Sequence, residues 1–411
     1  MSEFLKHSPL PVTDITSWAM DSLPLPDTRG GLIYLKEWRD NLTDAQGWLA
    51  RWGDPNLNVS GGGIRMKING MPEEAVFLAS TMYEKFGIAG PEINGSKFVI
   101  DYDPNSPDKM SVLSRFIGSF LHELENVGTA GDLGVSEEES AEVLRKHGID
   151  NPQFGILNGL GLLNNLGRLG EIMHTPLQEK LSPKHERLVD IAAGWSAFIS
   201  LKTYYELKGG TIAGKTIALQ GVGAVGGSAG FYLEKAGAII VAVADREGSL
   251  SLEGRRFEDV VKNVDPKTGC LNRRSDFETL GDSQAVLNLP ADALVVAATS
   301  EVIKDNNVGY IKAGVIVEGA NHPITPSADK SLEENGILVL PDFIVNAGTA
   351  ELFTIGMLGD CEISEQMVLQ KIAQITRNAM THASGISSNE GIPLREAARI
   401  VSTMMLWKQF V

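Results

Sequence analysis

The stretch "KTIALQGVGAVGGSAGFYLEKAGAIIVAVADREG", residues 215–248, decides the fold class. Gly221, Gly223 and Gly226 stand in the spacing Gly-X-Gly-X-X-Gly, after a β-branched apolar run and at the start of a segment with helical spacing. The first glycine permits a tight turn, the second lets the backbone approach a pyrophosphate, and the third lets helix and strand pack closely. A strand, a glycine turn and a helix in this order predict a dinucleotide-binding unit.

An acidic residue ends the next apolar run. Asp245 follows the glycine turn by about 20 residues, where a carboxylate accepts hydrogen bonds from a ribose hydroxyl of NAD. Ala224 and Val225 lie between the second and third glycines, at the start of the predicted helix, where backbone N–H groups attract phosphate charge. We therefore expect NAD as the cofactor. Arg246 keeps NADP open, because an arginine there accommodates a 2′-phosphate.

A competing motif lies inside the same stretch. "GGSAG" (226–230) fits Gly-X-Ser-X-Gly, the nucleophile elbow of hydrolases. That motif needs its serine on the strand-to-helix turn itself. Ser228 falls about two turns into the predicted helix, so we reject a hydrolase elbow.

Chain length and charge restrict the class of protein. A chain of 411 residues is too long for one ordinary core, so we expect two domains. A net charge of −16 argues against nucleic acid or an anionic membrane as a partner. No apolar run is long enough to span a membrane. Two cysteines and an N-terminus without signal-peptide character favour the cytoplasm.

The pattern of apolar residues along the chain changes after Gly214. Apolar β-branched runs then alternate with helical stretches, which is typical of a parallel sheet covered on both faces. We expect an α/β protein with a Rossmann dinucleotide-binding domain over 191–364. A second α/β domain, for substrate binding and oligomerisation, is expected over 1–190, completed by helices over 365–411. The substrate cleft is expected between the two.

Several helices can be placed by spacing and capping. Apolar spacing predicts one over 108–125, with Asp108 as its N-cap, and another that begins at Ser136. Residues 150–186 carry many Gly, Asn and Leu and give no assignment. His122 and Glu125 have metal-ligand spacing, but without a third ligand we expect no metal.

Seven segments, in the same order, resemble the amino-acid dehydrogenase superfamily of glutamate, leucine, phenylalanine and valine dehydrogenases. The resemblance covers about 57–135 and 190–411. The segments are "GGGIRM" (61–66), "ASTMYEKF" (79–86), "NGSK" (94–97), "TAGDLG" (129–134), "EGANHPITPSAD" (318–329), "LPDFIVNAGTAELF" (340–353) and "GIPLREAARIV" (391–401).

The resemblance implies three ionisable site residues. Lys85 would hold the substrate α-carboxylate, Lys97 would act as general base, and Asp132 would relay protons to and from the amine nitrogen. Physical chemistry allows these roles. A buried lysine repelled by a neighbouring ammonium, here Lys85, has a lowered pKa and can work as a free amine.

The implied reaction is oxidative deamination of an L-amino acid to its 2-oxo acid and ammonia, or the reverse. Hydride leaves Cα for the nicotinamide, water activated by Lys97 adds to the iminium carbon, and collapse expels ammonia. The resemblance places Ala298, Asn321 and Asn346 on the nicotinamide side. It also implies a homo-oligomer. Asn94 stands at a family glycine and is expected to keep the bend, because asparagine tolerates left-handed backbone.

The resemblance also indicates the substrate. Gly61, followed by Gly62, falls where glutamate dehydrogenases carry a lysine for the side-chain carboxylate, so glutamate is disfavoured. An apolar wall of Ala130, Ala350 and Phe353 fits a large apolar or aromatic amino acid. Two alternatives stay open. Glu351 would suit a basic or unusual substrate, and a non-catalytic nucleotide-binding or regulatory protein would use the same scaffold.

Overall fold

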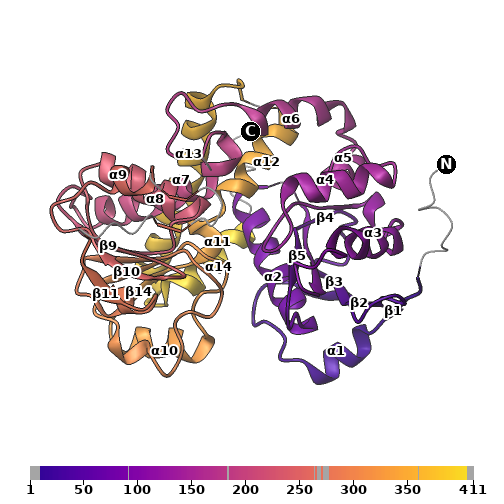
Figure 1. Ribbon diagram of the computed structural model, residues 1–411, viewed down its shortest axis with the longest axis horizontal. Coiled ribbons are helices and arrows are strands. Elements are labelled where there is room, and N and C mark those ends of the chain that lie inside the picture. Colours follow the sequence, from indigo (N-terminus) through magenta and orange to yellow (C-terminus); the bar gives the residue numbers. More distant parts are fainter. Residues whose placement is uncertain are drawn as a thin grey trace. The chain divides into compact units, whose positions relative to one another are not determined.

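The computed structural model describes residues 10–404 apart from 91, 183–184, 263, 266–269, 272–276 and 360. The chain divides into two compact units, residues 1–167 and 168–411. Each unit contains one seven-stranded sheet within its described residues (Figure 1). The expected α/β class is confirmed.

The first unit is built on a mixed sheet. The strand order is β1-β2-β3-β6-β4-β7, and β5 also pairs with β6. Neighbours from β1 to β6 are antiparallel, whereas β4 and β5 run parallel to β6, and β7 runs parallel to β4. The strands are β1 (Val12–Asp14), β2 (Gly31–Arg39), β3 (Gln46–Gly53), β4 (Ser60–Gly61), β5 (Ile64–Lys67), β6 (Asn94–Asp101) and β7 (Val127–Gly128).

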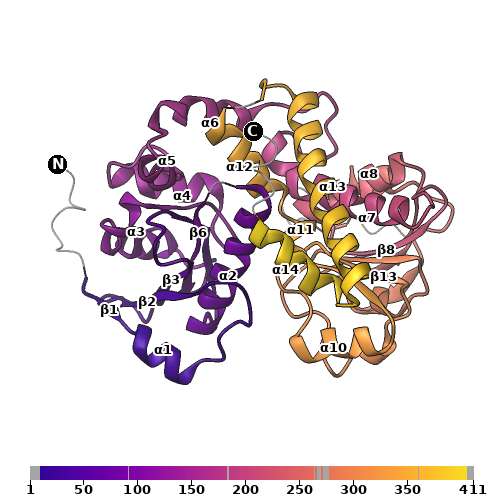
Figure 2. The same ribbon diagram turned by 180° about the vertical axis from the view of Figure 1, so that it is seen from behind.

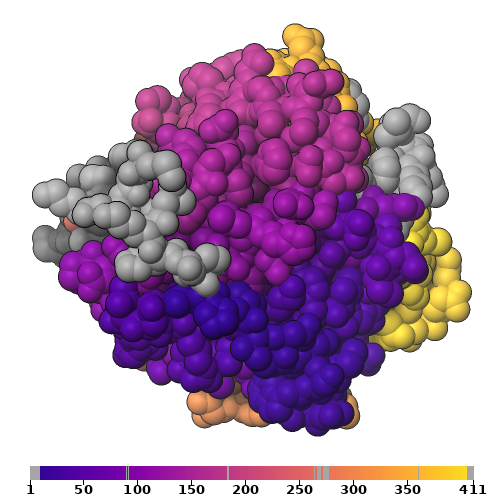
Figure 3. Space-filling model, turned by 90° about the vertical axis from the view of Figure 1, so that its right-hand side faces the viewer, coloured from indigo at the N-terminus to yellow at the C-terminus, as the bar shows by residue number. Residues whose placement is uncertain are grey.

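Helices cover both faces of this sheet. Successive side chains of a strand point to opposite faces. Phe98 of β6 belongs to one core with Phe116, and Val99 belongs to another with Val76. Figure 3 shows the indigo N-terminal segments and the purple segments after them as one continuous surface, as the sheet pairing requires. The helices are α1 (Thr16–Ser22), α2 (Pro72–Ala89), α3 (Lys109–Ser119), α4 (Glu137–Lys146) and α5 (Phe154–Gly159).

Two helix predictions can be compared with the observed helices α3 and α4. Ser136 caps α4 as expected, because its Oγ accepts from Glu139 N while Glu139 Oε2 accepts from Ser136 N. The helix predicted over 108–125 is shorter. It ends at Ser119 and is followed by a separate 3₁₀ turn, Glu123–Glu125. Asp108 precedes α3 without a capping bond from its side chain.

The second unit carries the predicted parallel sheet. The order is β11-β10-β9-β8-β12-β13-β14, and all neighbours from β9 to β14 are parallel. The edge strands β10 and β11 run antiparallel, because the chain reverses between Asp245 and Gly248. The strands are β8 (Thr216–Gln220), β9 (Ile239–Asp245), β10 (Gly248–Ser251), β11 (Thr279–Gly281), β12 (Ala293–Val296), β13 (Val315–Glu318) and β14 (Leu338–Leu340).

Helices of the second unit pack around α7. Figure 2 shows α13 beside α7, and Trp195 Nε1 donates to the Leu369 oxygen at 2.8 Å. The helices are α6 (Leu166–His174), which spans the division, α7 (Leu188–Leu207), α8 (Ala224–Lys235), α9 (Phe257–Val261), α10 (Pro326–Glu334), α11 (Asp342–Val345), α12 (Gly348–Leu358), α13 (Glu365–Glu390) and α14 (Leu394–Met404). No helix among the described residues is long and apolar enough to cross a membrane.

The observed division differs from the predicted domains. The units meet at 167 and 168, before the predicted boundary at 190, and 365–404 cluster with the second unit. The reason is the packing of α13 against α7 and α12. The assignment of the C-terminal helices to a substrate domain stays a prediction.

Candidate functional site

The first unit brings Lys97, Asp132 and Arg65 together. Lys97 lies in β6 and Arg65 in β5, which pairs with β6. Asp132 lies in the segment after β7. This segment runs beside β5, because Ile64 N donates to the Ala130 oxygen at 2.9 Å.

A tight turn presents Asp132. Asp132 N donates to Val135 O at 2.9 Å, and Val135 N donates to Asp132 O at 3.0 Å. Gly134 inside the turn has φ +77°, and a Cβ there would lie 1.9 Å from Met66 O. Only glycine fits this backbone and this space. The turn therefore fixes Asp132 in position.

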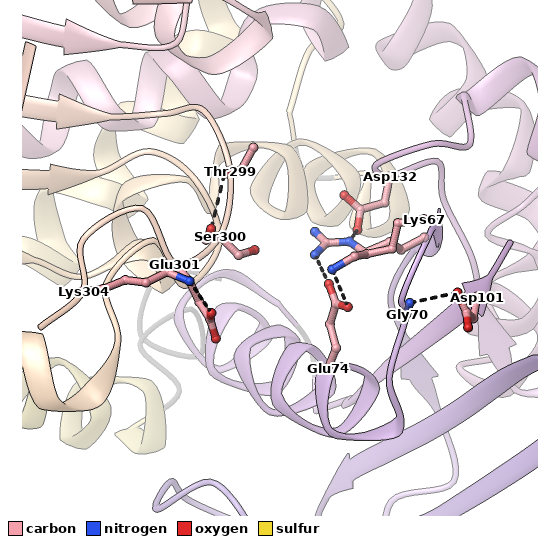
Figure 4. Close-up of polar contacts among 10 residues, drawn as sticks. Lys67, Gly70, Glu74, Asp101, Asp132, Thr299, Ser300, Glu301 and Lys304 are labelled. Carbon is pink, nitrogen blue, oxygen red and sulfur yellow. Dashed lines mark hydrogen bonds and ion pairs between the residues drawn. The ribbon is translucent and has the colours of Figure 1, made fainter. Parts of the chain in front are cut away.

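One carboxylate oxygen of Asp132 binds both cations. Lys97 Nζ lies 2.5 Å and Arg65 Nε 3.0 Å from Asp132 Oδ2. Arg65 Nη1 also donates to Glu74 Oε1 at 2.7 Å, and Lys67 Nζ lies 3.2 Å from Glu74 Oε2. Figure 4 shows Lys67, Glu74 and Asp132 turned toward one another. These charges form one linked network.

Burial sets the electrostatics of this network. Lys97 is 4% exposed. Loss of water lowers the pKa of Lys97, the Asp132 carboxylate opposes that shift, and the Arg65 guanidinium adds to it. The guanidinium of Arg65, in the segment "GGGIRM", thus repels the Lys97 ammonium, and the sequence predicted no role for it. The repulsion expected from Lys85 stays a prediction.

The carboxyl of the pair stays ionised. Burial raises the pKa of Asp132, but Lys97 and Arg65 outweigh burial and hold that pKa well below its usual range. A proton can move to Asp132 only when a neighbouring cation gives up its charge. The pair is therefore one coupled titrating unit.

Lys85 is also buried. It lies in α2 and is 6% exposed. Lys97 shares its face of β6 with Gly95, whose added Cβ would lie 2.4 Å from Tyr83 N in α2, so this face is turned toward α2. The role of Lys85 in holding an α-carboxylate stays a prediction.

Gly61 and Gly62 lie in tightly packed surroundings. A Cβ on Gly61 would lie 2.6 Å from Ile156 Cδ1 and 2.9 Å from Phe86 Cζ. A Cβ on Gly62 would lie 1.7 Å from Ser96 O, so this position admits glycine alone. Ile156 of α5 belongs to the stretch that the sequence left unassigned. The place that a side chain at position 61 would take is thus filled by apolar side chains.

The other predicted pocket residues lie in separate units. Ala130 is half-buried in the first unit, and Ala350 and Phe353 are buried in α12 of the second. Glu351 is fully buried, with its carboxyl 3.2 Å from Thr376 Oγ1. Burial raises the pKa of Glu351 to about 8. A carboxyl that is mostly neutral at neutral pH is a poor partner for a basic substrate.

The nucleotide loop has the predicted shape. It joins β8 to α8, and Gly221 has φ +93°. A Cβ on Gly226 would lie 1.9 Å from Gly221 O, so helix and strand need glycine there. A Cβ on Gly223 would meet nothing within 4 Å. The loop is therefore open where a pyrophosphate would lie, and the cradle fits a dinucleotide.

Asp245 ends β9 as predicted. Its Oδ1 accepts from Glu247 N at 2.8 Å, and its Oδ2 accepts from Leu271 N at 2.7 Å. Each carboxylate oxygen keeps further acceptor capacity for a ribose hydroxyl. Arg246 is exposed, and its Nε donates to Cys270 Sγ at 3.1 Å.

The predicted nicotinamide-side residues follow the carboxyl ends of the parallel strands. Ala298 is exposed after β12. Asn346 Nδ2 donates to Asn321 Oδ1 at 3.1 Å and to Gly319 O at 3.2 Å. Asn346 Oδ1 is buried without a hydrogen-bond partner among the described residues. An unsatisfied buried acceptor fits the amide donor of a nicotinamide.

The expectation for Asn94 is wrong. The described non-glycine residues with positive φ are Asn69, Glu301 and His322. Asn94 is instead the first residue of β6. Its Nδ2 donates to Asp54 O at 2.9 Å, so the side chain anchors the loop after β3 rather than a bend.

Two family models match the chain. The model described as Glutamate/Leucine/Phenylalanine/Valine dehydrogenase matches residues 188–411. The model described as Glu/Leu/Phe/Val dehydrogenase, dimerisation domain, matches residues 36–147.

Two curated relatives are named as glutamate dehydrogenases. Glutamate dehydrogenase of Aeropyrum pernix is 29% identical over 360 residues, covering 84% of this chain and 82% of the relative. NADP(+)-dependent glutamate dehydrogenase of Pyrobaculum calidifontis is 27% identical over 297 residues, covering 70% of this chain and 66% of the relative.

Solved structures share the fold. Hetero-hexameric glutamate dehydrogenase from Thermus thermophilus, in its Leu-bound form, superposes with a TM-score of 0.70 at 21% identity, covering 98% of this chain and 89% of that one. L-tryptophan dehydrogenase from Nostoc punctiforme gives a TM-score of 0.59 at 16% identity, covering 93% and 97%.

Proposed function

Because the chain belongs to the glutamate/leucine/phenylalanine/valine dehydrogenase family and is an NAD(P)-dependent amino-acid dehydrogenase, we propose that it deaminates a large apolar or aromatic L-amino acid with NAD. The reverse reductive amination uses the same groups. The observation that carries the proposal is the buried Lys97–Asp132 pair, with Nζ 2.5 Å from Oδ2.

Each residue of the proposed site has a task that its chemistry allows. Lys85 supplies a fixed cation for the substrate α-carboxylate. Lys97, with its lowered pKa, takes a proton from the water that adds to the substrate carbon. Asp132 exchanges protons with the amine nitrogen while Lys97 is neutral. The bound nicotinamide supplies the hydride acceptor.

The apolar surroundings of Gly61 support the substrate class. Phe86 and Ile156 fill the place where a side chain of residue 61 would begin, so position 61 supplies no cation. A glutamate substrate would lack that partner for its side-chain carboxylate, and an unpaired buried carboxylate costs several kcal/mol. The proposal departs at this point from the curated relatives, which are named for glutamate. That Ala350 and Phe353 line a substrate pocket stays a prediction; both side chains are buried in the second unit.

The acid at the end of β9 supports NAD. The carboxylate of Asp245 would repel a 2′-phosphate, whereas it accepts hydrogen bonds from a 2′-hydroxyl. One relative is named as NADP-dependent, so the choice needs a direct comparison. We also propose a closed symmetric homo-oligomer, the commonest kind of assembly among soluble oligomers. One structural neighbour is described as a hetero-hexamer, which supports assembly as such but not identical subunits. Sedimentation of the purified protein tests that assembly.

A substrate panel tests the function. Purified protein is mixed with each standard L-amino acid and either NAD or NADP, and the absorbance of the reduced nicotinamide is followed. We expect the highest kcat/KM with an apolar or aromatic substrate and NAD. A preference for glutamate contradicts the proposed pocket, and a preference for NADP contradicts the role given to Asp245.

A further inference from the structure

A histidine within residues 150–186, for which the sequence predicted no helix or strand, packs directly against the glycine-rich nucleotide loop between β8 and α8. His185 is 2% exposed, and its Nε2 lies 3.2 Å from both Gly223 O and Ala224 O. All three residues belong to the second unit. Carbonyl oxygens only accept hydrogen bonds, so Nε2 must carry the proton.

Ser182 fixes that tautomer. Ser182 Oγ lies 2.6 Å from His185 Nδ1, and both side chains are buried. With the ring proton on Nε2 of a neutral imidazole, Nδ1 accepts and the serine hydroxyl donates. The backbone holds the pair in place, because His185 N donates to Ser182 O at 3.0 Å.

Helix α8 has room for the imidazole ring of His185 because a glycine, Gly227, faces the ring. A Cβ on Gly227 would lie 2.9 Å from His185 Cε1. Gly227 follows the last glycine of the Gly-X-Gly-X-X-Gly motif and is not part of it. An alanine at this position would push against the ring.

The two carbonyls determine where two N–H groups point. In a planar trans peptide, the C=O of one residue is antiparallel to the N–H of the next. Holding Gly223 O therefore orients the N–H of Ala224, and holding Ala224 O orients the N–H of Val225. These N–H groups begin α8 and have no acceptor inside the helix. They are the groups that a pyrophosphate would meet.

We propose that His185, with its tautomer set by Ser182, is a positioning residue that preorganises the pyrophosphate-binding loop for the dinucleotide. Gly223 O also accepts from Gly227 N at 2.8 Å inside α8, and His185 adds a second bond from outside the helix. Such a bond restricts a loop whose glycines allow other backbone conformations. A loop ordered before binding loses less entropy when the ligand arrives. The inference rests on the proposed dinucleotide cofactor but not on the amino acid.

Binding of the nucleotide alone tests the proposal. The dissociation constants of NAD and NADP are measured by calorimetry without amino acid, since both ligands share the pyrophosphate. We expect His185→Leu to weaken binding of the preferred nucleotide about tenfold. His185→Gln keeps a donor near Nε2, so its dissociation constant should stay within about threefold of that of the original chain. The dissociation constant of Ser182→Ala should lie between those of His185→Gln and His185→Leu.

A matched histidine provides the control. His147 Nε2 lies 2.9 Å from the backbone oxygen of Ser114 in the first unit, so it makes the same kind of bond away from the loop. His147→Leu should leave the nucleotide dissociation constant unchanged. With nucleotide varied, His185→Leu should raise the KM for nucleotide. At saturating nucleotide, the same variant should leave kcat and the KM for amino acid nearly unchanged.

Several results would overturn the proposal. Equal nucleotide affinity in His185→Leu and the original chain would do so, as would an original chain that binds neither nucleotide. If His185→Leu fails to fold, nucleotide binding by Ser182→Ala and His185→Gln tests the proposal instead. Should Ser182→Ala bind as tightly as the original chain, the histidine has a merely structural role. Failure of the amino-acid panel leaves this binding result intact, so the two proposals fail separately.

Discussion

Lys97 Nζ lies 2.5 Å from Asp132 Oδ2, and Arg65 Nε binds the same oxygen at 3.0 Å. A single carboxylate oxygen thus joins a buried ammonium to a guanidinium that cannot lose its proton. The carboxylate favours the charged form of Lys97, whereas burial and Arg65 favour the neutral amine. The protonation of the proposed base therefore depends on Arg65.

We predict that Arg65→Gln moves the acid limb of the pH profile upward. The kcat/KM should rise with pH as Lys97 loses its proton. Arg65 lowers the pKa of Lys97, so its removal raises that pKa, and the limb should move to higher pH. Steady-state rates across pH measure this limb.

Lys67 is the control for this change. It also pairs with Glu74, at 3.2 Å, but its side chain is 37% exposed. Lys67→Gln should leave the limb in place. A limb that stays fixed in Arg65→Gln, with the protein folded, would show that Lys97 is not the group that titrates.

Substitution of Ile156 should change substrate preference. Its Cδ1 lies 2.6 Å from the Cβ position of Gly61, and truncation to alanine opens the space beside that glycine. We expect Ile156→Ala to raise kcat/KM for the bulkiest aromatic substrates, relative to smaller aliphatic ones, by about tenfold. The measurement is the same substrate panel.

The neighbouring Leu157 separates specificity from stability. It is fully buried in the same helix. Either truncation should cost about 2–5 kcal/mol of stability, but Leu157→Ala should leave the order of substrates unchanged. An unchanged order in Ile156→Ala as well would remove Gly61 from the pocket.

Glu351 should make stability depend on pH. Burial raises its pKa from 4.5 to about 8, so between these values the folded chain holds a proton that the unfolded chain releases. Stability contributed by Glu351 is therefore lost as pH rises from 4.5 through about 8. Relative to Glu351→Gln, the original chain should lose roughly 2–4 kcal/mol over this range in urea unfolding.

An exposed carboxyl provides the comparison. Glu334 ends α10 and is exposed to solvent. Glu334→Gln should track the original chain across the same pH range. A stability difference between Glu351→Gln and the original chain that is constant with pH would contradict a neutral buried carboxyl.

The sequence predicted the structural features that depend on residues close together in the chain. The glycine loop after β8, the parallel strands that follow it and the cap at Ser136 all rest on residues close together in the chain. Each of these signals needs only spacing and side-chain chemistry.

Other features depend on contacts that a single sequence does not encode locally. Arg65 meets Asp132 only because the segment after β7 pairs with β5. The described residues within 150–186 form short helices and turns, and distant partners place several of their side chains. Ile156 beside Gly61 and His185 beside Gly223 are examples. The antiparallel edge at β10 depends on a reversal after Asp245 that the alternating pattern did not reveal.

The most direct test of the account is a paired measurement on Lys97→Ala, with turnover of the best amino acid and the dissociation constant of NAD determined on the same protein. Loss of a general base should reduce kcat by about 10²–10⁴-fold, while NAD binding stays as in the original chain. Lys109→Ala, which breaks an ion pair to Glu139 at 2.6 Å elsewhere in the first unit, should keep its turnover. Turnover by Lys97→Ala at the rate of the original chain would contradict the assignment of Lys97 as the catalytic base.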